Sequence, residues 1–279
     1  EQGLVDVVFK KFAKVGYTNT SKNWDNWNTI VNSLQKTDDA IKIAMVGKYV
    51  TLADSYVSVN EALKHASASI GRSVNIDWID SETFNGNLNQ LDNFDGVLVP
   101  GGFGTRGSEG IIDTATYALE KNIPYLGICF GFQLAAIAFG RKICNLENAN
   151  STEIIVDTKN PIIDLLPEQK DETDMGGSLR LGANEIKISQ DSLAHKIYSS
   201  DKIFKRHRHR YEFNTEYREE FLKKGMIFSG ESDDGRRMEI LEVPSHKFFL
   251  GVQFHPEFNS RPGFPEDAFK TFVTAASQN

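Results

Sequence analysis

Two patterns of apolar residues alternate along most of the chain. Short apolar runs that end at glycine, proline or a polar residue are typical of buried strands in a parallel sheet. Longer stretches between them have apolar residues at every third or fourth position, as on one face of a helix. The expected strands span residues 41–46, 73–79, 95–100, 124–128 and 248–254, and the expected helices span residues 55–70, 111–121 and 134–139. This alternation predicts an α/β fold with a mostly parallel central sheet flanked by helices.

Residues 1–40 follow a different pattern. They combine short apolar patches with turns rich in Asn, Thr and Ser, and only Trp24, Trp27 and the apolar residues after them have helical spacing. We expect this stretch to be a linker or extension, followed by a main domain over residues 41–279. Because the chain begins at Glu1 and not at methionine, we also expect it to be a piece of a longer polypeptide.

A second break in the pattern lies between residues 148 and 182. A β-rich run at residues 151–156 is followed by an acidic loop at 168–174 and a glycine-flanked run at 176–182. We expect a small antiparallel insertion here. The acidic loop is a candidate for a mobile lid, and a solvated loop without a role is the alternative.

The composition is that of an ordinary globular protein. Of the 279 residues 40% are hydrophobic, and the net charge of -7 argues against general binding to nucleic acid or membrane surfaces. Cys129 and Cys144 are too few for a disulfide framework or a four-cysteine zinc site. We therefore expect a reducing, cytoplasmic setting. The sequence contains neither the apolar core of a signal peptide nor an apolar run of about 18 residues, so we expect no membrane span.

Cys129 is the first candidate for chemistry. It ends an apolar run, lies between Gly127 and Gly131, and directly precedes a helix-forming stretch. This pattern predicts a nucleophile elbow, a sharp strand-to-helix turn that presents one reactive side chain. The partial positive charge at the helix N-terminus would favour the thiolate. A buried structural cysteine is the alternative that this stretch alone leaves open.

His255 and Glu257 follow the last expected strand. In an extended segment, residues two apart point to the same side, so the two side chains should lie next to each other. A carboxylate placed there can hold one imidazole nitrogen and leave the other free as a base. A surface histidine without a catalytic role would be the commoner case for an isolated H-x-E, but the cysteine elbow favours the catalytic interpretation.

The glycine-rich loop at residues 101–107 permits two functions. It matches neither the Walker pattern nor the G-x-G-x-x-G dinucleotide motif, so a phosphate site has weak support. Its backbone N–H groups could instead approach a developing oxyanion beside the elbow. A tight turn that needs positive φ is the structural alternative.

Residues 205–211 form the only dense basic cluster of the sequence. A nucleic-acid contact or localisation signal is disfavoured, because the cluster is short and the chain acidic. As for a metal site, we expect His207 and His209 to lack a third ligand nearby. An anion site, for example for a substrate carboxylate, is better supported, because guanidinium groups bind carboxylates in a bidentate geometry.

Three separated motifs together resemble the class I, triad-type glutamine amidotransferases. They are G-G-x-G at residues 101–104, G-x-C-x-G at 127–131 and H-P-E at 255–257. Further segments narrow the resemblance to the C-terminal glutaminase domain of the CTP synthase family, namely residues 46–49, 99–104, 148–153, 175–177, 179–182, 206–212 and 253–258. The resemblance covers residues 41–275 and implies the flavodoxin-like fold of that family.

The resemblance implies a role for each matching residue. Cys129 would attack the side-chain amide of glutamine, His255 would shuttle the proton, and Glu257 would orient His255. The N–H groups of Gly102 and Phe130 would form the oxyanion hole. The residues implied to bind glutamine are Gly102, Phe130, Gly131, Phe132, Gln133, Glu153 and Arg210. Those implied to act in GTP activation are Arg106, Gly107 and Glu109, and no metal ligand is implied in this domain.

The resemblance also implies partners outside this chain. In such enzymes the ammonia from L-glutamine passes to an N-terminal synthase domain of the same polypeptide, which aminates UTP to CTP with Mg-ATP. GTP acts as an allosteric activator, and the full-length enzyme is a homotetramer. We therefore expect no cofactor in this chain, a low glutaminase rate, and no CTP synthesis by the chain alone.

One departure from the family and two rival functions are visible. Phe130 and Phe132 stand where many relatives have Leu and Met, which predicts altered packing beside the nucleophile and not a loss of activity. A γ-glutamyl hydrolase or another thiol hydrolase could share the triad, but has no reason to carry the cluster at 206–212. A catalytically silent assembly module is the rival from another class.

Overall fold

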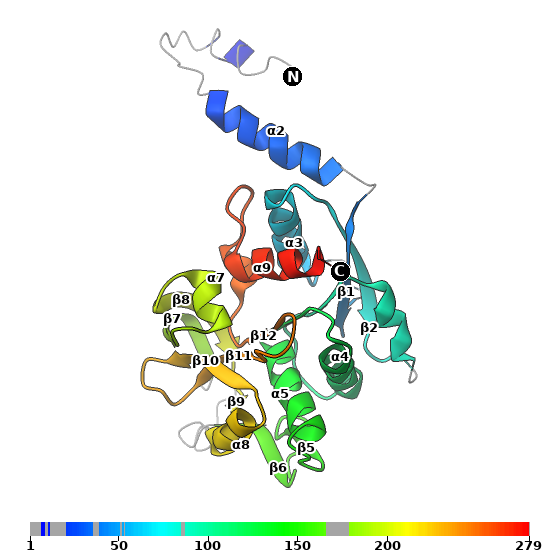
Figure 1. Ribbon diagram of the computed structural model, residues 1–279, viewed down its shortest axis with the longest axis vertical. Helices are drawn as coiled ribbons and strands as arrows, with labels where there is room; N and C mark the ends of the chain where they lie inside the picture. Colours follow the sequence, from blue (N-terminus) through cyan, green and yellow to red (C-terminus); the bar gives the residue numbers. More distant parts are fainter. Residues whose placement is uncertain are drawn as a thin grey trace.

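The computed structural model describes residues 7–8, 11, 21–35, 39–50, 52, 54–84, 87–165 and 179–278. Within these residues a nine-stranded sheet runs in the order β2-β1-β3-β4-β12-β11-β10-β7-β8, with helices against it (Figure 1). No described helix is both long and apolar enough to cross a membrane.

The first half of the sheet is parallel. Its strands are β2 (Val74–Asp80), β1 (Ile41–Gly47), β3 (Gly96–Val99), β4 (Tyr125–Ile128) and β12 (Phe249–Val252). All four pairings between neighbouring strands are parallel. β1, β3, β4 and β12 are buried almost throughout, as strands covered on both faces must be. The predicted parallel sheet is confirmed in this half.

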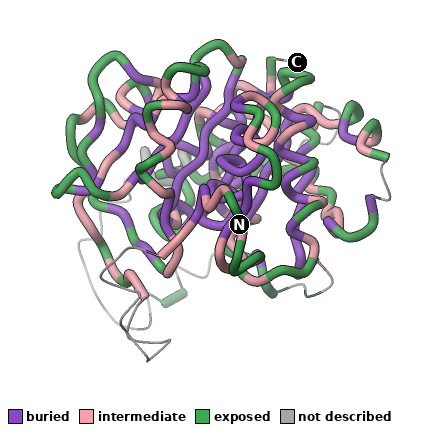
Figure 2. Tube along the Cα trace, turned by 90° about the horizontal axis from the view of Figure 1, so that it is seen from below, coloured by how far each residue is buried: buried purple, intermediate pink, exposed green. Residues whose placement is uncertain are grey.

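Helices cover both faces of the parallel half. α4 (Ser108–Lys121) and α5 (Phe130–Lys142) pack together on one face, and α3 (Val57–Ser69) and α9 (Asp267–Ala276) on the other. Alternate residues of each strand supply the two cores, so Tyr125 joins the first and Leu126 the second. Figure 2 shows the buried segments gathered in the centre of the molecule.

The second half of the sheet is antiparallel. Its strands are β11 (Met238–Glu242), β10 (Ile227–Ser232), β7 (Arg180–Ile188) and β8 (Lys202–His209). Each pairs antiparallel with its neighbour, beginning with β11 against β12. The antiparallel region is therefore larger than the small insertion that the sequence predicts, and it continues the main sheet.

A separate three-stranded sheet holds β5 (Ala149–Ser151), β6 (Asn160–Asp164) and β9 (Glu212–Phe213). Only β6 and β9 are antiparallel, because β5 and β6 run parallel. The strand expected at 151–156 is wrong beyond Ser151: the N–H groups of Ile154 and Ile155 both donate to the Ser151 carbonyl and form a turn. The acidic loop at 168–174 and the matching segment at 175–177 lie outside the described residues.

The remaining helices are short, apart from one near the N-terminus. α2 (Ser21–Gln35) lies in the predicted extension and contacts α3, and it confirms the helical spacing that begins at Trp24. In Figure 1 it projects from the body of the sheet. The boundary at residue 40 stays a prediction. The others are η1 (Leu88–Asn93), α7 (Leu193–Tyr198), η2 (Thr215–Tyr217), α8 (Arg218–Lys223) and η3 (Pro256–Asn259).

Candidate active site

Cys129 lies at the turn between β4 and α5, as predicted for an elbow. Its φ of 52° and ψ of -98° are strained for a residue other than glycine. The Cys129 N–H donates to the Val252 carbonyl at 2.7 Å, and the Cys129 carbonyl accepts from Gln133 N at 3.1 Å. A Cβ at Gly131 would lie only 2.4 Å from the Val99 carbonyl oxygen, so the turn packs against β3 with no room for a side chain.

His255 and Glu257 lie above the same sheet edge as Cys129. β4 and β12 are parallel neighbours with Ile128 opposite Val252, so their carboxyl ends coincide. The Nδ1 atom of His255 is 2.8 Å from Glu257 Oε1, and a Cβ on Gly101 would touch both His255 and Cys129. Burial lowers the pKa of His255, but hydrogen bonds with Cys129 and Glu257 outweigh it and raise the pKa to about 10. The raised pKa favours the protonated imidazole, which is the form that can donate a proton.

Two buried glutamines connect the thiol to the backbone of Tyr211. Gln253 Nε2 lies 3.7 Å from Cys129 Sγ, and Gln133 Nε2 donates to Gln253 Oε1 at 3.2 Å and to the Tyr211 carbonyl at 2.9 Å. No sequence pattern assigned a role to Gln253. Its position in the sequence could have indicated it, because Gln253 directly follows the strand β12, as Cys129 directly follows β4.

A pocket of about 810 Å³ opens over the thiol, a size typical of small-molecule sites. Its lining brings Cys129 and His255 together with four predicted glutamine-binding residues. The lining residues are Tyr49, Ser55, Tyr56, Gly101, Gly102, Phe103, Cys129, Gln133, Glu153, Leu179, Arg208, His209, Arg210, Tyr211 and His255.

The other predicted contacts lie beside or behind this pocket. Phe132 is fully buried against Gly251. The ring of Phe130 packs beneath the Lys48 ammonium, 4.2 Å from the ring centroid. A Cβ at Gly102 would lie 3.5 Å from Phe130 Cδ1, so the Gly102 backbone packs against the Phe130 side chain. Their predicted oxyanion-hole role, and the glutamine contacts of Gly131 and Phe132, stay predictions.

Lys48 and Glu153 fix the glycine loop from two sides. Lys48 Nζ donates to the carbonyls of Phe103, at 2.9 Å, and Gly104. Glu153 Oε1 accepts from Gly104 N at 2.6 Å. Burial lowers the pKa of Lys48 to about 8 and raises that of Glu153. Sequence reasoning missed Lys48 because its partners are carbonyls of a distant loop.

The residues predicted to act in GTP activation cluster at the start of α4. Arg106 donates to the Lys48 carbonyl at 2.7 Å and pairs with Glu82 at 3.2 Å. Gly107 caps the helix with a φ of 65°. Glu109 forms a bidentate ion pair with Arg141. The structure therefore joins Arg106 to Lys48, whose ammonium holds the glycine loop, and GTP binding itself stays a prediction.

The expectation that His207 and His209 lack a third ligand nearby is wrong. β11 brings Glu239 beside them, and one potential ligand atom from each lies within 4.8 Å of the others, in a buried position. Sequence spacing could not show this, because the pairing of strands creates the cluster. Glu239 is, however, already ion-paired with Arg180 and hydrogen-bonded to His207, which favours a polar network over a metal site.

Comparisons with known proteins agree with this geometry. The family model described as "Glutamine amidotransferase class-I" matches residues 51–275. CTP synthase of Halalkalibacterium halodurans is 52% identical over 90% of this chain and 47% of its own length. CTP synthase of Staphylococcus haemolyticus is 49% identical over 99% of this chain and 51% of its own length. The chain thus spans about half the length of these relatives.

Solved structures extend the likeness to the fold. The glutaminase domain of Trypanosoma brucei CTP synthase, solved with bound acivicin, superposes with a TM-score of 0.81. It is 37% identical, and the match covers 86% of this chain and 95% of that one. The predicted resemblance is confirmed. The chain belongs to the class I glutamine amidotransferase family and within it is similar to the glutaminase domains of CTP synthases.

Proposed function

We propose that this chain hydrolyses L-glutamine to glutamate and ammonia through a thioester on Cys129. The observation that carries the proposal is the placement of Cys129, His255 and Glu257 above one sheet edge, beside a pocket of suitable size. The same arrangement of nucleophile, imidazole and orienting carboxylate cleaves amides on several unrelated folds.

The reaction would proceed in two balanced steps. The Cys129 sulfur forms a bond to the side-chain carbonyl carbon of glutamine, the C–N bond breaks, and His255 gives its proton to the departing ammonia. Water then adds to the thioester carbonyl while His255 takes up a proton, and the C–S bond breaks to release glutamate. Glu257 holds Nδ1 of His255 throughout, so that Nε2 faces the sulfur.

Charged groups on the pocket wall would hold the amino-acid end of glutamine. Arg210 lines the pocket and would pair with the α-carboxylate. Glu153 also lines the pocket and would receive the α-ammonium. Gln133 lines the same pocket and would contact the substrate amide. Gly102 and Phe130 would stabilise the oxyanion through their N–H groups.

The fate of the ammonia extends the proposal beyond this chain. The similarity to CTP synthases, of which the chain spans about half, supports transfer to a synthase domain that aminates UTP with Mg-ATP. Activation by GTP through Arg106, Gly107 and Glu109, a role in pyrimidine synthesis, a cytoplasmic location and a homotetrameric full-length enzyme belong to the same proposal.

Labelling with a glutamine-like electrophile tests the proposed chemistry. Diazo-oxo-norleucine should modify Cys129 and leave Cys144 unmodified, as read by peptide mass spectrometry. Cys144 is a suitable internal control, because it is buried and burial raises its pKa to about 12. A folded protein without an adduct on Cys129 would favour the silent assembly module.

A further inference from the structure

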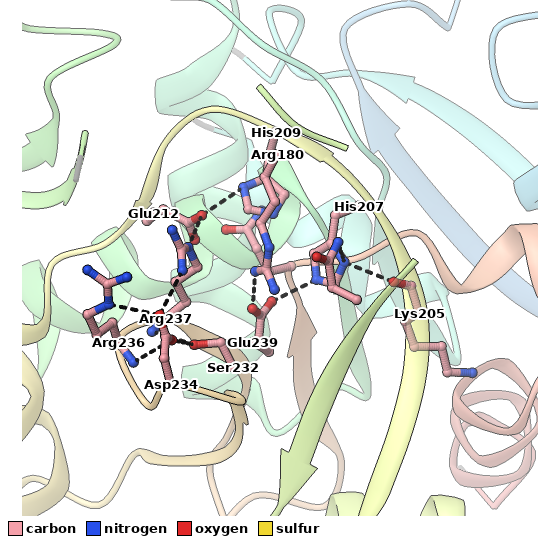
Figure 3. A network of polar contacts seen from close by, with 12 residues as sticks. Arg180, Lys205, His207, His209, Glu212, Ser232, Asp234, Arg236, Arg237 and Glu239 are labelled. Carbon is pink, nitrogen blue, oxygen red and sulfur yellow. Dashed lines mark hydrogen bonds and ion pairs between the residues drawn. The ribbon is translucent and has the colours of Figure 1, made fainter. Parts of the chain in front are cut away.

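A buried ionic network lies in the antiparallel half of the sheet (Figure 3). Its centre is Glu239 of β11, whose side chain is 0% exposed. One carboxylate oxygen of Glu239 pairs with Arg180 of β7, and the other lies 2.8 Å from Nε2 of His207 on β8. A single carboxylate thus holds side chains from both strands at the outer edge of the sheet.

Ionic contacts keep Glu239 charged despite its burial. Burial raises the pKa of Glu239, but the hydrogen bonds and charges of His207 and Arg180 outweigh it and lower the pKa below its usual range. Removing one partner from a buried ion pair is strongly destabilising, because the remaining charge stays buried without compensation. The network therefore has a strong preference for one arrangement of these three side chains.

The strand held by this network forms one wall of the active site. The β8 backbone at Arg206 accepts a hydrogen bond from His255 N at 2.8 Å, and the Arg208 carbonyl lies 3.9 Å from Cys129 Sγ. Just beyond the strand, the Tyr211 carbonyl accepts from Gln133. Arg210 lies between these contacts and lines the pocket. A shift of β8 would therefore move the residue proposed to bind the substrate carboxylate.

We propose that Glu239 is a positioning residue for glutamine, which fixes the end of β8 so that Arg210 faces the α-carboxylate subsite. This inference rests on the proposed function. Glu239 itself lies behind β8 and does not line the pocket described above. It acts through His207 and through Arg180. Arg180 of β7 lies opposite His209 of β8 in the pairing of these two strands.

Replacing Glu239 by Gln tests this role. Two electrophiles measured on the same protein separate substrate positioning from thiol reactivity. Diazo-oxo-norleucine has the amino-acid end of glutamine and needs the carboxylate subsite, whereas iodoacetamide is small and needs only the thiol. We expect Glu239→Gln to slow labelling of Cys129 by diazo-oxo-norleucine about tenfold or more, as expected for a displacement of about 1 Å, and to leave the iodoacetamide rate within about twofold.

A matched control exists on the same pair of strands. Glu185 of β7 pairs with Lys202 of β8 at 2.7 Å, at the end of the hairpin away from Arg180. Glu185→Gln removes an ion pair between the same strands, and we expect it to leave both labelling rates unchanged. Glu239→Asp keeps the charge and should restore part of the diazo-oxo-norleucine rate.

A milder variant covers the case that Glu239→Gln does not fold. His207→Asn removes the hydrogen bond but leaves the Arg180–Glu239 pair, so no buried charge loses its only partner. It should slow the diazo-oxo-norleucine rate severalfold in a protein that melts as one cooperative unit. Equal slowing of both electrophiles, or no slowing by either variant in folded protein, would overturn the positioning role. Failure of the wild-type protein to react with diazo-oxo-norleucine would instead overturn the proposed function.

Discussion

The two halves of the central sheet contribute different parts of the candidate site. The parallel half carries the thiol, imidazole and carboxylate at the ends of β4 and β12. The antiparallel half carries a wall formed by Arg208 to Tyr211, supported from behind by buried charges. The first half has an apolar interior, whereas the second keeps Glu239, Glu242 and His207 below 3% exposure.

This difference shows which physical effect positions each part. Apolar packing and backbone hydrogen bonds fix the elbow, because β4 is covered on both faces and Gly131 has no room for a side chain. Ion pairs contribute more to the wall at residues 208–211, because β8 is the edge strand of the sheet and has a neighbour on one side only. Variants in the two halves should therefore affect different kinetic constants.

The largest effect is expected for the nucleophile in the parallel half. Cys129→Ala should abolish glutamine hydrolysis, a loss of about 10³-fold or more, because no other group can form the thioester. An ammonia-release assay measures this. Cys144→Ala removes the other cysteine, from the core, and should retain most of the activity. Equal losses in the two variants would contradict the assignment.

The next effect is expected for the orienting carboxylate. Glu257→Gln should lower kcat by about 10²- to 10⁴-fold, because the imidazole loses the charge that stabilises its protonated form. The KM for glutamine should change little, since Glu257 is not among the pocket-lining residues. Steady-state kinetics would contradict the account if KM changed more than kcat.

In the antiparallel half, Arg210→Lys should act mainly on binding. Lysine keeps the charge but cannot form a bidentate pair with a carboxylate, so the KM for glutamine should rise about tenfold with a smaller change in kcat. Arg206→Lys is the matched control, because Arg206 is exposed on β8, which ends directly before Arg210, and does not line the pocket. A kcat effect larger than the KM effect would place Arg210 in the chemical step.

The smallest effect is a difference in how the two halves respond to pH. The pKa of His255 is raised from 6.5 to about 10, so between these pH values the folded state keeps a proton that the unfolded state has lost. The contribution of His255 to stability is therefore lost as the pH rises from 6.5 to about 10. His209 has a pKa lowered by burial to about 3, so its contribution is lost as pH falls from 6.5 towards 3. Chemical denaturation across pH should show a shallower alkaline slope in His255→Asn and a shallower acid slope in His209→Asn. Unchanged slopes would contradict these pKa shifts.

The sequence predicted the parallel half because its signals are local. Glycines on both sides of Cys129, the H-P-E segment and the apolar runs each report on a few neighbouring residues, and parallel strands bring their ends to one edge. Local signals can also give a wrong prediction outside this half. The apolar residues at 151–156 are typical of a strand, yet Val156 is 78% exposed in a turn.

The antiparallel half could not be predicted in the same way. Glu239 lies on β11 and His207 on β8, and β10 and β7 lie between these two strands in the sheet. Their contact therefore depends on the order of the strands in the sheet. The same holds for one contact in the parallel half, where Lys48 reaches the Phe103 carbonyl across 55 residues of sequence. Apolar periodicity reports which face of a strand is buried, but not which strand will be its neighbour, so buried ion pairs between strands stay hidden.

Trapping of the acyl intermediate tests most directly whether Cys129 and His255 cleave the amide together. Hydroxylamine added with glutamine should intercept the thioester, so the wild-type protein should form γ-glutamyl hydroxamate while Cys129→Ala forms none. Ammonia release without hydroxamate, or hydroxamate formed at the wild-type rate by Cys129→Ala, would contradict the account.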